Sequence, residues 1–253
     1  MARGIGMAVG WPGGVTSAGR RGTGQGMAAD PATLRRLYGR RQGHALRRGQ
    51  AERVERLLPG LSVPGDGPLT ARRLFGDDRP LWLEVGFGAG EHLAFQAARH
   101  REVGLVGCEP FLNGVVGLLR HVETAQLDNV RVHMGDALDV LERLADASLE
   151  RLFLLHPDPW PKARHAKRRF VNPGPMGLAA AKLKPGGELR MATDHPLYLR
   201  WALMVMRGQP AFRWTATTPE DWQSVPEDWP DTRYGAKARA LGHEIWRLRY
   251  VRV

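Results

Sequence analysis

The chain has 253 residues, 43% of them hydrophobic, and this length predicts one large domain or two small ones. A single cysteine, Cys108, excludes an internal disulfide and a zinc site built on paired cysteines, and it indicates a reducing, cytoplasmic compartment. No apolar run approaches the roughly 18 residues that span a bilayer, so no membrane segment is expected. The net charge of +11 predicts attraction to a polyanion, either nucleic acid or an anionic membrane face.

The N-terminal part of the chain is low in acidic residues. Residues 1–29 are rich in glycine and contain no acid, which predicts a disordered tail, and Met27 is a candidate start of translation. Residues 30–68 are predicted to form a basic extension, helical over 30–58 and followed by a linker whose turn signals begin at Pro59-Gly60. The rest, 69–253, is expected to be one domain.

From residue 81 onward, short apolar runs alternate with segments of helical length. This alternation is typical of a parallel sheet covered by helices, and therefore of the α/β class. After Pro210 the pattern weakens into a predicted loop with Trp214, Trp222 and Trp229, followed by a strand at 244–251. The five predicted strands before it are Leu81–Val85, Gly104–Cys108, Val130–His133, Arg151–Leu155 and Glu188–Ala192.

A glycine-rich turn follows the first predicted strand. Gly86, Gly88 and Gly90 are spaced as Gly-x-Gly-x-Gly, and Glu91 stands where a dinucleotide-binding loop has its third glycine. An acidic side chain at the start of a helix disfavours a pyrophosphate, so we expect a nucleoside ligand without phosphates, such as S-adenosylmethionine. Glu84, inside the strand, is placed to order this loop near the sulfonium or the methionyl amine.

Acidic residues also follow the later predicted strands. Glu109 comes 19 residues after the glycine turn, where a carboxylate can bind both ribose hydroxyls of a nucleoside. Asp136 is placed to receive the adenine amino group or to orient the loop around it, while Asp158 and Asp194 follow the next two strands. Any one of these acids could be a helix cap or a turn residue. Together they predict a ligand site at the carboxyl edge of the sheet.

The segment His156-Pro-Asp-Pro-Trp-Pro-Lys162 carries three alternating prolines, which predict a stiff loop that holds the Asp158 carboxylate and the Trp160 indole. Trp160 could stack on a base or simply cover the loop. Five permanent cations and His165 follow within residues 162–169. A solvated basic face would explain this run, but its position beside the loop favours phosphate contacts across the cofactor mouth.

These motifs resemble those of the bacterial tRNA (guanine-N7-)-methyltransferases, the TrmB family, over roughly residues 35–253. The resemblance implies a Rossmann-like class I methyltransferase with a seven-stranded, mostly parallel sheet, S-adenosylmethionine as cofactor and tRNA as partner, acting as a monomer or homodimer. The most specific stretch is Pro157-Asp-Pro-Trp-Pro-Lys-Ala-Arg-His-Ala-Lys-Arg-Arg-Phe170. The other matching stretches are Leu83–Gly90, Gly107–Pro110, Leu183–Gly187, Met191–Asp194 and Leu241–Trp246.

The resemblance also assigns roles to individual residues. It implies that Asp158 is the catalytic residue, and that the cofactor is bound by Glu84, Gly86, Gly88, Gly90, Glu109, Asp136 and Asp158. Substrate contacts are implied for Lys162, Asp194, Thr232, Arg233, Tyr234 and Gly235, and RNA contacts for Arg164, His165, Lys167, Arg168 and Arg169. The chain departs from the family pattern at His156, where the family has a phenylalanine, and in the C-terminal motif. That motif is Thr-Lys-Phe-Glu followed by x-Arg-Gly in the family, whereas here it reads Thr232-Arg-Tyr-Gly235 followed by Ala236-Lys-Ala238, so the glutamate is replaced by Gly235.

The expected reaction is methyl transfer to N7 of a guanosine in the tRNA variable loop, which forms 7-methylguanosine. Guanine N7 has a lone pair and no proton, so the transfer requires alignment and charge stabilisation but no general base. Asp158 or Asp194 could stabilise the positive charge or receive the guanine donors. His156, His165 and His243 lack ligand spacing, so no metal is expected. The alternatives are a methyltransferase with another RNA, protein or small-molecule substrate, or a catalytically silent RNA-binding relative.

Overall fold

A computed structural model describes residues 43–253 of the chain, and these belong to one compact unit. The expectations for the tail at 1–29, the start at Met27 and the helical character of residues 30–42 lie outside the described residues.

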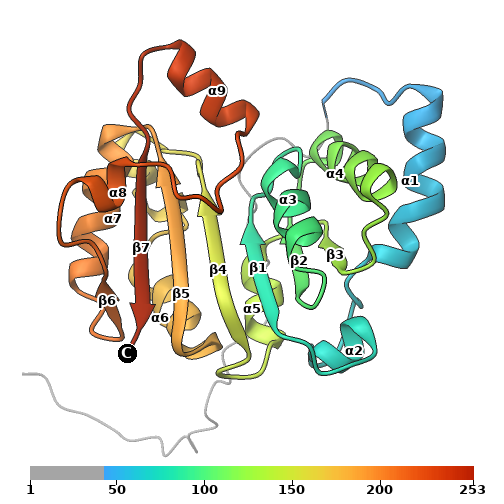
Figure 1. Ribbon diagram of the computed structural model, residues 1–253, viewed down its shortest axis with the longest axis horizontal. Helices are drawn as coiled ribbons and strands as arrows, with labels where there is room; N and C mark the ends of the chain where they lie inside the picture. The colour runs from blue at the N-terminus through green and yellow to red at the C-terminus, as the bar shows by residue number, and fades with distance from the viewer. Residues whose placement is uncertain (1–42) are drawn as a thin grey trace, which may run out of the picture. The chain divides into compact units, whose positions relative to one another are not determined.

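The centre of the described part is a seven-stranded sheet with the order β3-β2-β1-β4-β5-β7-β6 (Figure 1). Strands β1 to β5 are parallel to one another, whereas β7 runs antiparallel to both β5 and β6. The predicted seven-stranded, mostly parallel α/β fold is therefore confirmed. The strands are β1 (Leu81–Val85), β2 (Gly104–Cys108), β3 (Val130–His133), β4 (Leu149–Leu155), β5 (Leu183–Thr193), β6 (Phe212–Trp214) and β7 (Trp246–Arg252).

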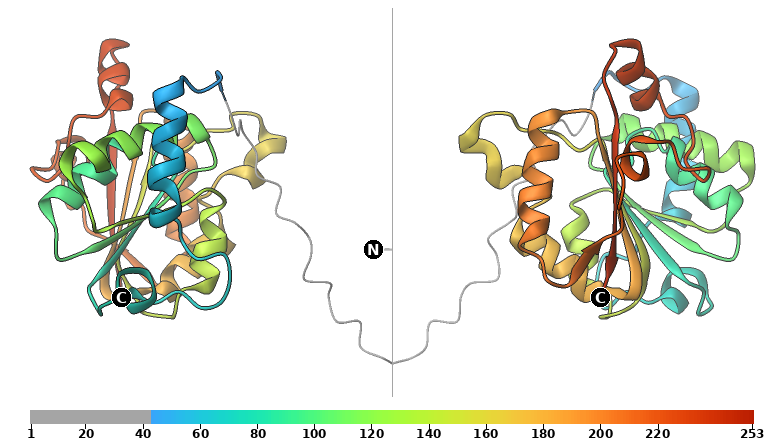
Figure 2. Two further views of the ribbon diagram at one scale, coloured as in Figure 1. Left: turned by 90° about the vertical axis from the view of Figure 1, so that its right-hand side faces the viewer. Right: turned by 60° about the vertical axis from the view of Figure 1, so that its left-hand side comes forward.

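Helices cover both faces of the sheet, which explains why the central strands are apolar on both sides (Figure 2). Helices α5 (Ala137–Arg143), α6 (Pro173–Lys182) and α7 (Pro196–Arg207) supply the core of one face. Helices α3 (Glu91–Arg99) and α4 (Leu112–Ala125) supply the core of the other. The remaining helical segments are α1 (Arg48–Leu61), α2 (Ala71–Phe75), η1 (Ala163–Arg168), α8 (Glu220–Gln223) and α9 (Arg233–Ala240).

Helix α1 packs against α4 as an outer layer of the α3–α4 face. The helix predicted over residues 30–58 was wrong at 43–47, because α1 begins only at Arg48. The linker predicted to begin at Pro59 was placed too early, because the helix continues through Pro59 to Leu61. Its apolar side chains Val54, Leu57, Leu58 and Leu61 pack on the core, and this burial outweighs the hydrogen bond that the proline removes. Two of its arginines, Arg53 and Arg56, bind Glu123 of α4.

The predicted tryptophan-rich loop was wrong at two positions. Trp214 lies in β6, paired with Tyr250 of β7, and Trp222 lies in the short helix α8. Only Phe212 of β6 is buried, so this three-residue edge strand has no alternating apolar pattern to reveal it. No helix among residues 43–253 is both long and apolar enough to cross a membrane.

Candidate active site

The glycine turn has a backbone that other residues rarely adopt. Gly86, Gly88 and Gly90 all have positive φ angles, of 68°, 58° and 78°, and α3 begins directly after them at Glu91. A Cβ on Gly90 would lie 2.6 Å from the Cβ of Leu118. The turn therefore favours glycine at all three predicted positions, because a side chain would strain the backbone at each of them and at Gly90 would also clash with α4.

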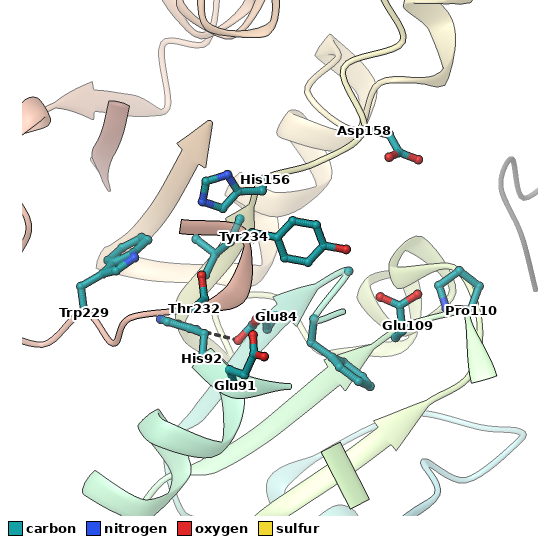
Figure 3. A pocket seen from close by; sticks show the side chains of 13 residues that line it. Glu84, Glu91, His92, Glu109, Pro110, His156, Asp158, Trp229, Thr232 and Tyr234 are labelled. Atoms are coloured by element: carbon teal, nitrogen blue, oxygen red, sulfur yellow. Dashed lines mark hydrogen bonds and ion pairs between the residues drawn. The ribbon is translucent and has the colours of Figure 1, made fainter. Parts of the chain in front are cut away.

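A cavity of about 220 Å³ opens at the carboxyl edge of the sheet, beside this turn (Figure 3). Its acidic lining combines Glu84 of β1, Glu91 of α3, Glu109 after β2 and Asp158 after β4. Thr232 and Tyr234 enter it from the C-terminal part of the chain. Three acids predicted from separate segments of the sequence, Glu84, Glu109 and Asp158, therefore line one cavity together with Glu91, which suits a ligand with cationic and hydroxyl groups.

Glu84 lies at the floor of the cavity and is 2% exposed. Its Oε2 accepts a hydrogen bond from Nδ1 of His92 at 2.7 Å, drawn in Figure 3. The His92 ring packs against Trp229, with ring centroids 5.4 Å apart, and Gln96 donates a hydrogen bond to the Asp228 carbonyl. Sequence reasoning missed His92. The available signal was its place as the second residue of α3, directly after the glycine turn that follows the strand of Glu84.

Glu109 links the glycine turn to the loop after β2. Its two carboxylate oxygens accept hydrogen bonds from the backbone N–H of Gly88 at 2.8 Å and of Phe111 at 3.0 Å. Burial raises the pKa of Glu109, assisted by the nearby carboxylates of Asp158 and Glu84, although the two backbone hydrogen bonds oppose this. The predicted ribose-binding acid is thus held in a fixed orientation beside the cavity.

Asp136 has a structural role in this conformation. It is the N-cap of α5, where its side chain accepts a hydrogen bond from the Leu138 N–H at 3.0 Å. It is not among the residues that line the cavity. The sequence allowed such a helix cap, and the adenine contact expected from the family stays a prediction.

The proline-rich loop carries Asp158 into the cavity rim, where its side chain is exposed. His156 and Trp160, two positions before and after it, both adopt positive φ angles, of 47° and 42°. Such angles are uncommon for residues other than glycine, and they mark a loop whose shape is imposed by its surroundings.

Arg169 is one of the residues that hold this loop in place. The structure corrects the RNA contact that was expected for it. Its side chain is 5% exposed, and its guanidinium donates hydrogen bonds to the carbonyls of Pro159 at 3.0 Å and Trp160 at 2.9 Å. The guanidinium also lies 4.6 Å from the ring centroid of Trp201. Through these contacts Arg169 clamps the proline-rich loop. Because its guanidinium is buried and its donors are satisfied, it cannot reach a phosphate.

The other members of the basic run differ from Arg169. Lys162, Arg164 and Lys167 are exposed on or beside η1, next to the proline-rich loop. Arg168 and His165 both contact Trp160, through a cation–π contact at 5.0 Å and an edge-on ring contact at 5.8 Å. Trp160 therefore belongs to this basic surface at the rim of the site.

Asp194 is bound by two histidines. His156 Nδ1 lies 3.2 Å from one carboxylate oxygen of Asp194, and His243 Nδ1 lies 3.3 Å from the other. Burial alone would raise the pKa of Asp194, but the hydrogen bonds from the two histidines bring it below its usual value. Asp194 does not line the cavity in this conformation, and it holds the loops of His156 and His243 together.

The Thr232–Gly235 segment lies over the glycine turn. Thr232 caps α9 by accepting a hydrogen bond from the Gly235 N–H at 3.1 Å. A Cβ on Gly88 would lie 3.1 Å from the Tyr234 ring, which also stacks on His156. Arg233 forms an ion pair with Glu91, a partner that the sequence did not suggest. Thr232 and Tyr234 line the cavity that contains Glu84 and Glu109, while Gly235 lines a neighbouring one.

Comparisons with known proteins agree with this geometry. Residues 78–248 match a family described as "Putative methyltransferase". A solved structure, "Structure of an Antibiotic Related Methyltransferase", is similar in fold, with a TM-score of 0.51 and 14% identity over 78% of this chain and 99% of its own. Two relatives are both called tRNA (guanine-N(7)-)-methyltransferase. The one from Zymomonas mobilis is 61% identical, and the one from Sphingopyxis alaskensis is 58% identical. Each alignment covers 88% of this chain and 97% of the relative. The chain therefore belongs to the tRNA (guanine-N(7)-)-methyltransferase family.

Proposed function

We propose that this protein methylates N7 of a guanosine in the variable loop of tRNA, with S-adenosylmethionine as the methyl donor. The observation that carries this proposal is the similarity to a relative named tRNA (guanine-N(7)-)-methyltransferase, which is 61% identical to this chain over 97% of the relative's length. The cavity supports it, because Gly86 of the glycine turn, Glu109 and Asp158 all line it. We also propose that the enzyme acts in the cytoplasm, as a monomer or homodimer.

The residues present fit the cofactor. The left-handed glycines allow a ligand to approach the backbone closely, and two carboxylates of the cavity, those of Glu84 and Glu109, are buried and oriented by hydrogen bonds. When bound, S-adenosylmethionine supplies an activated methyl group. Glu109 would hold the ribose hydroxyls, while Glu84, fixed by His92, would face the positively charged methionyl end.

Asp158 is the residue we assign to the chemical step. Guanine N7 carries no proton, so none of the side chains has to act as a base, and the transfer leaves a positive charge on the guanine imidazole ring. The exposed carboxylate of Asp158 at the cavity rim is positioned to stabilise this charge. The clamp by Arg169 keeps the loop in place before the substrate arrives.

The exposed cations of η1 would contact the tRNA backbone. Lys162, Arg164 and Lys167 lie beside Asp158 in sequence, so a phosphate bound there would bring the nucleic acid across the mouth of the cavity. Such contacts provide affinity and register, whereas recognition of the base must come from the residues of the cavity.

The test is methyl transfer from labelled S-adenosylmethionine to an unmodified tRNA transcript, followed by nucleoside analysis. We expect 7-methylguanosine as the product, and no product from a transcript whose variable-loop guanosine is replaced by adenosine. Label recovered in another nucleoside, or in protein, would contradict the proposal. Tight tRNA binding without measurable cofactor binding would instead identify a catalytically silent relative.

A further inference from the structure

A second cavity, of about 320 Å³, lies beside the cofactor cavity and shares His156, Trp229 and Thr232 with it. We call it the Arg247 pocket, after the arginine of β7 that lines it. Its other charged lining residues are Asp231 and Arg239. The family resemblance implies substrate contacts for Thr232 and Gly235 of this lining, but no role described above involves Arg247.

Arg247 is buried, with 8% of its surface exposed, and it has no acidic partner among the described residues. Its Nη1 donates to the carbonyls of Gln223 and Ile245, both at 3.1 Å, while its buried Nε has no acceptor in this part of the chain. Burial lowers the pKa of Arg247, and the nearby cation Arg239 lowers it further. A buried guanidinium with an unused donor and no counter-charge is energetically unfavourable unless a ligand supplies the anion.

Unlike Arg247, the neighbouring arginines on the same face of the sheet are paired with acidic side chains. Arg190 binds both Glu188 and Asp228, at 2.8 Å and 2.6 Å, and Arg249 binds Glu188 as well. Arg151 lies 3.5 Å from Glu188 and also approaches Asp228. The two acids of this cluster are thus shared by three arginines, and Arg247, nearer the site, is not one of them.

The rest of the Arg247 pocket also favours an anion. Its lining includes Thr232, the N-cap of α9, and Gly235 in the first turn of that helix, which is the positive end of the helix dipole. Arg239 lies at its mouth with a half-exposed side chain. Asp231 binds Arg239, and the nearby carboxylate of Asp194 is bound by His156 and His243, so neither acid is free to neutralise Arg247.

We infer that the Arg247 pocket is an oxyanion-binding subsite, in which Arg247 and Arg239 hold a phosphate group of the bound tRNA. The assignment to tRNA rests on the proposed function. The pocket adjoins both the cofactor cavity and the loop of Asp158, so a phosphate held there lies beside the nucleotide that is methylated. The cofactor's own carboxylate is the other oxyanion that could reach it, and the test separates these two sources.

The first measurement uses inorganic phosphate as the probe and requires no tRNA. Phosphate should raise the Tm of the wild-type protein, because a ligand that binds only the folded state stabilises it. Arg247→Gln should lose this response, whereas Arg249→Gln, which removes the same charge from a carboxylate-paired arginine on the same strand, should keep it. Without phosphate, Arg247→Gln should unfold no earlier than the wild type, because it removes an uncompensated buried charge.

The second measurement compares tRNA and cofactor binding. Arg247→Gln should weaken tRNA binding roughly tenfold or more, the scale of a charge-assisted hydrogen bond, and lower the salt dependence of log K by about 0.7–0.9. Its affinity for S-adenosylmethionine should stay unchanged. Weaker cofactor binding with normal tRNA binding would assign the pocket to the cofactor carboxylate and overturn the phosphate assignment. Wild-type behaviour in both assays, or a lowered Tm without phosphate, would leave Arg247 a structural residue. Because product identity enters none of these readouts, their failure is distinct from failure of the proposed reaction.

Discussion

Replacing Arg169 tests whether the end of the basic run is a clamp or an RNA contact. Arg169→Ala removes two hydrogen bonds from a charged donor, at 3.0 Å and 2.9 Å, and a cation–π contact with Trp201. Each such hydrogen bond contributes about 1.5–3 kcal/mol, and a desolvated cation–π contact about 2 kcal/mol. Water can reach the released carbonyls, so we expect a net loss of about 2–4 kcal/mol.

This loss corresponds to a fall in Tm of about 5–15 °C for a domain of this size. Because the clamped carbonyls belong to the residues after Asp158, the rate of a single methylation turnover at saturating tRNA and cofactor should fall as well. Arg169→Lys should recover little of either, since an ammonium cannot reproduce the fork that spans two carbonyls. Differential scanning fluorimetry and rapid-quench kinetics provide the two readouts.

Lys167→Ala is the matched control, because Lys167 belongs to the same run but is exposed. It should leave Tm unchanged and lower the slope of log K for tRNA against log salt by about 0.7–0.9, the value for one phosphate contact. Arg169→Ala should leave that slope unchanged. If Arg169→Ala instead keeps the wild-type Tm and lowers the slope, the clamp is refuted and the RNA contact is restored.

Three further predictions concern the cavity and its surroundings. Asp158→Asn should lower the saturated single-turnover rate by a factor of about 10²–10³ with little change in binding, and a near-normal rate would move the catalytic role to Asp194. Glu109→Ala should weaken S-adenosylmethionine binding by roughly 1.5–3 kcal/mol, and unchanged affinity by calorimetry would contradict the ribose assignment. Burial lowers the pKa of His156 below 6.5, so its contribution to stability is present above pH 6.5 and declines as pH falls toward the folded pKa. His156→Phe, which keeps an aromatic ring beside Tyr234, should therefore lose less Tm than the wild type between pH 7.5 and 5.5, and equal losses would refute this.

The sequence alone determined the α/β class and most of the strands. Leu81–Val85, Gly104–Cys108 and Val130–His133 were predicted with the bounds that the structure shows, because buried parallel strands are short apolar runs bounded by turn residues. Topology then explains why Glu109 and Asp158, 49 positions apart, line one cavity: parallel strands end at the same edge of the sheet. Gly86, Gly88 and Gly90 were predicted for a different reason, since the turn after β1 requires a left-handed backbone that glycine adopts without strain.

Which polar residues are buried and which partners they bind was decided only by the tertiary structure. Arg169 and Lys167 look alike in a basic run, yet one is buried under two carbonyls and the other is exposed. Likewise, Arg247 and Arg249 lie two positions apart on one strand, but only Arg249 reaches a carboxylate. Charge and spacing are local properties of the chain, whereas burial and the choice of partner depend on segments that lie far apart in sequence. For this reason the unpaired guanidinium beside the active site could not be found from the sequence.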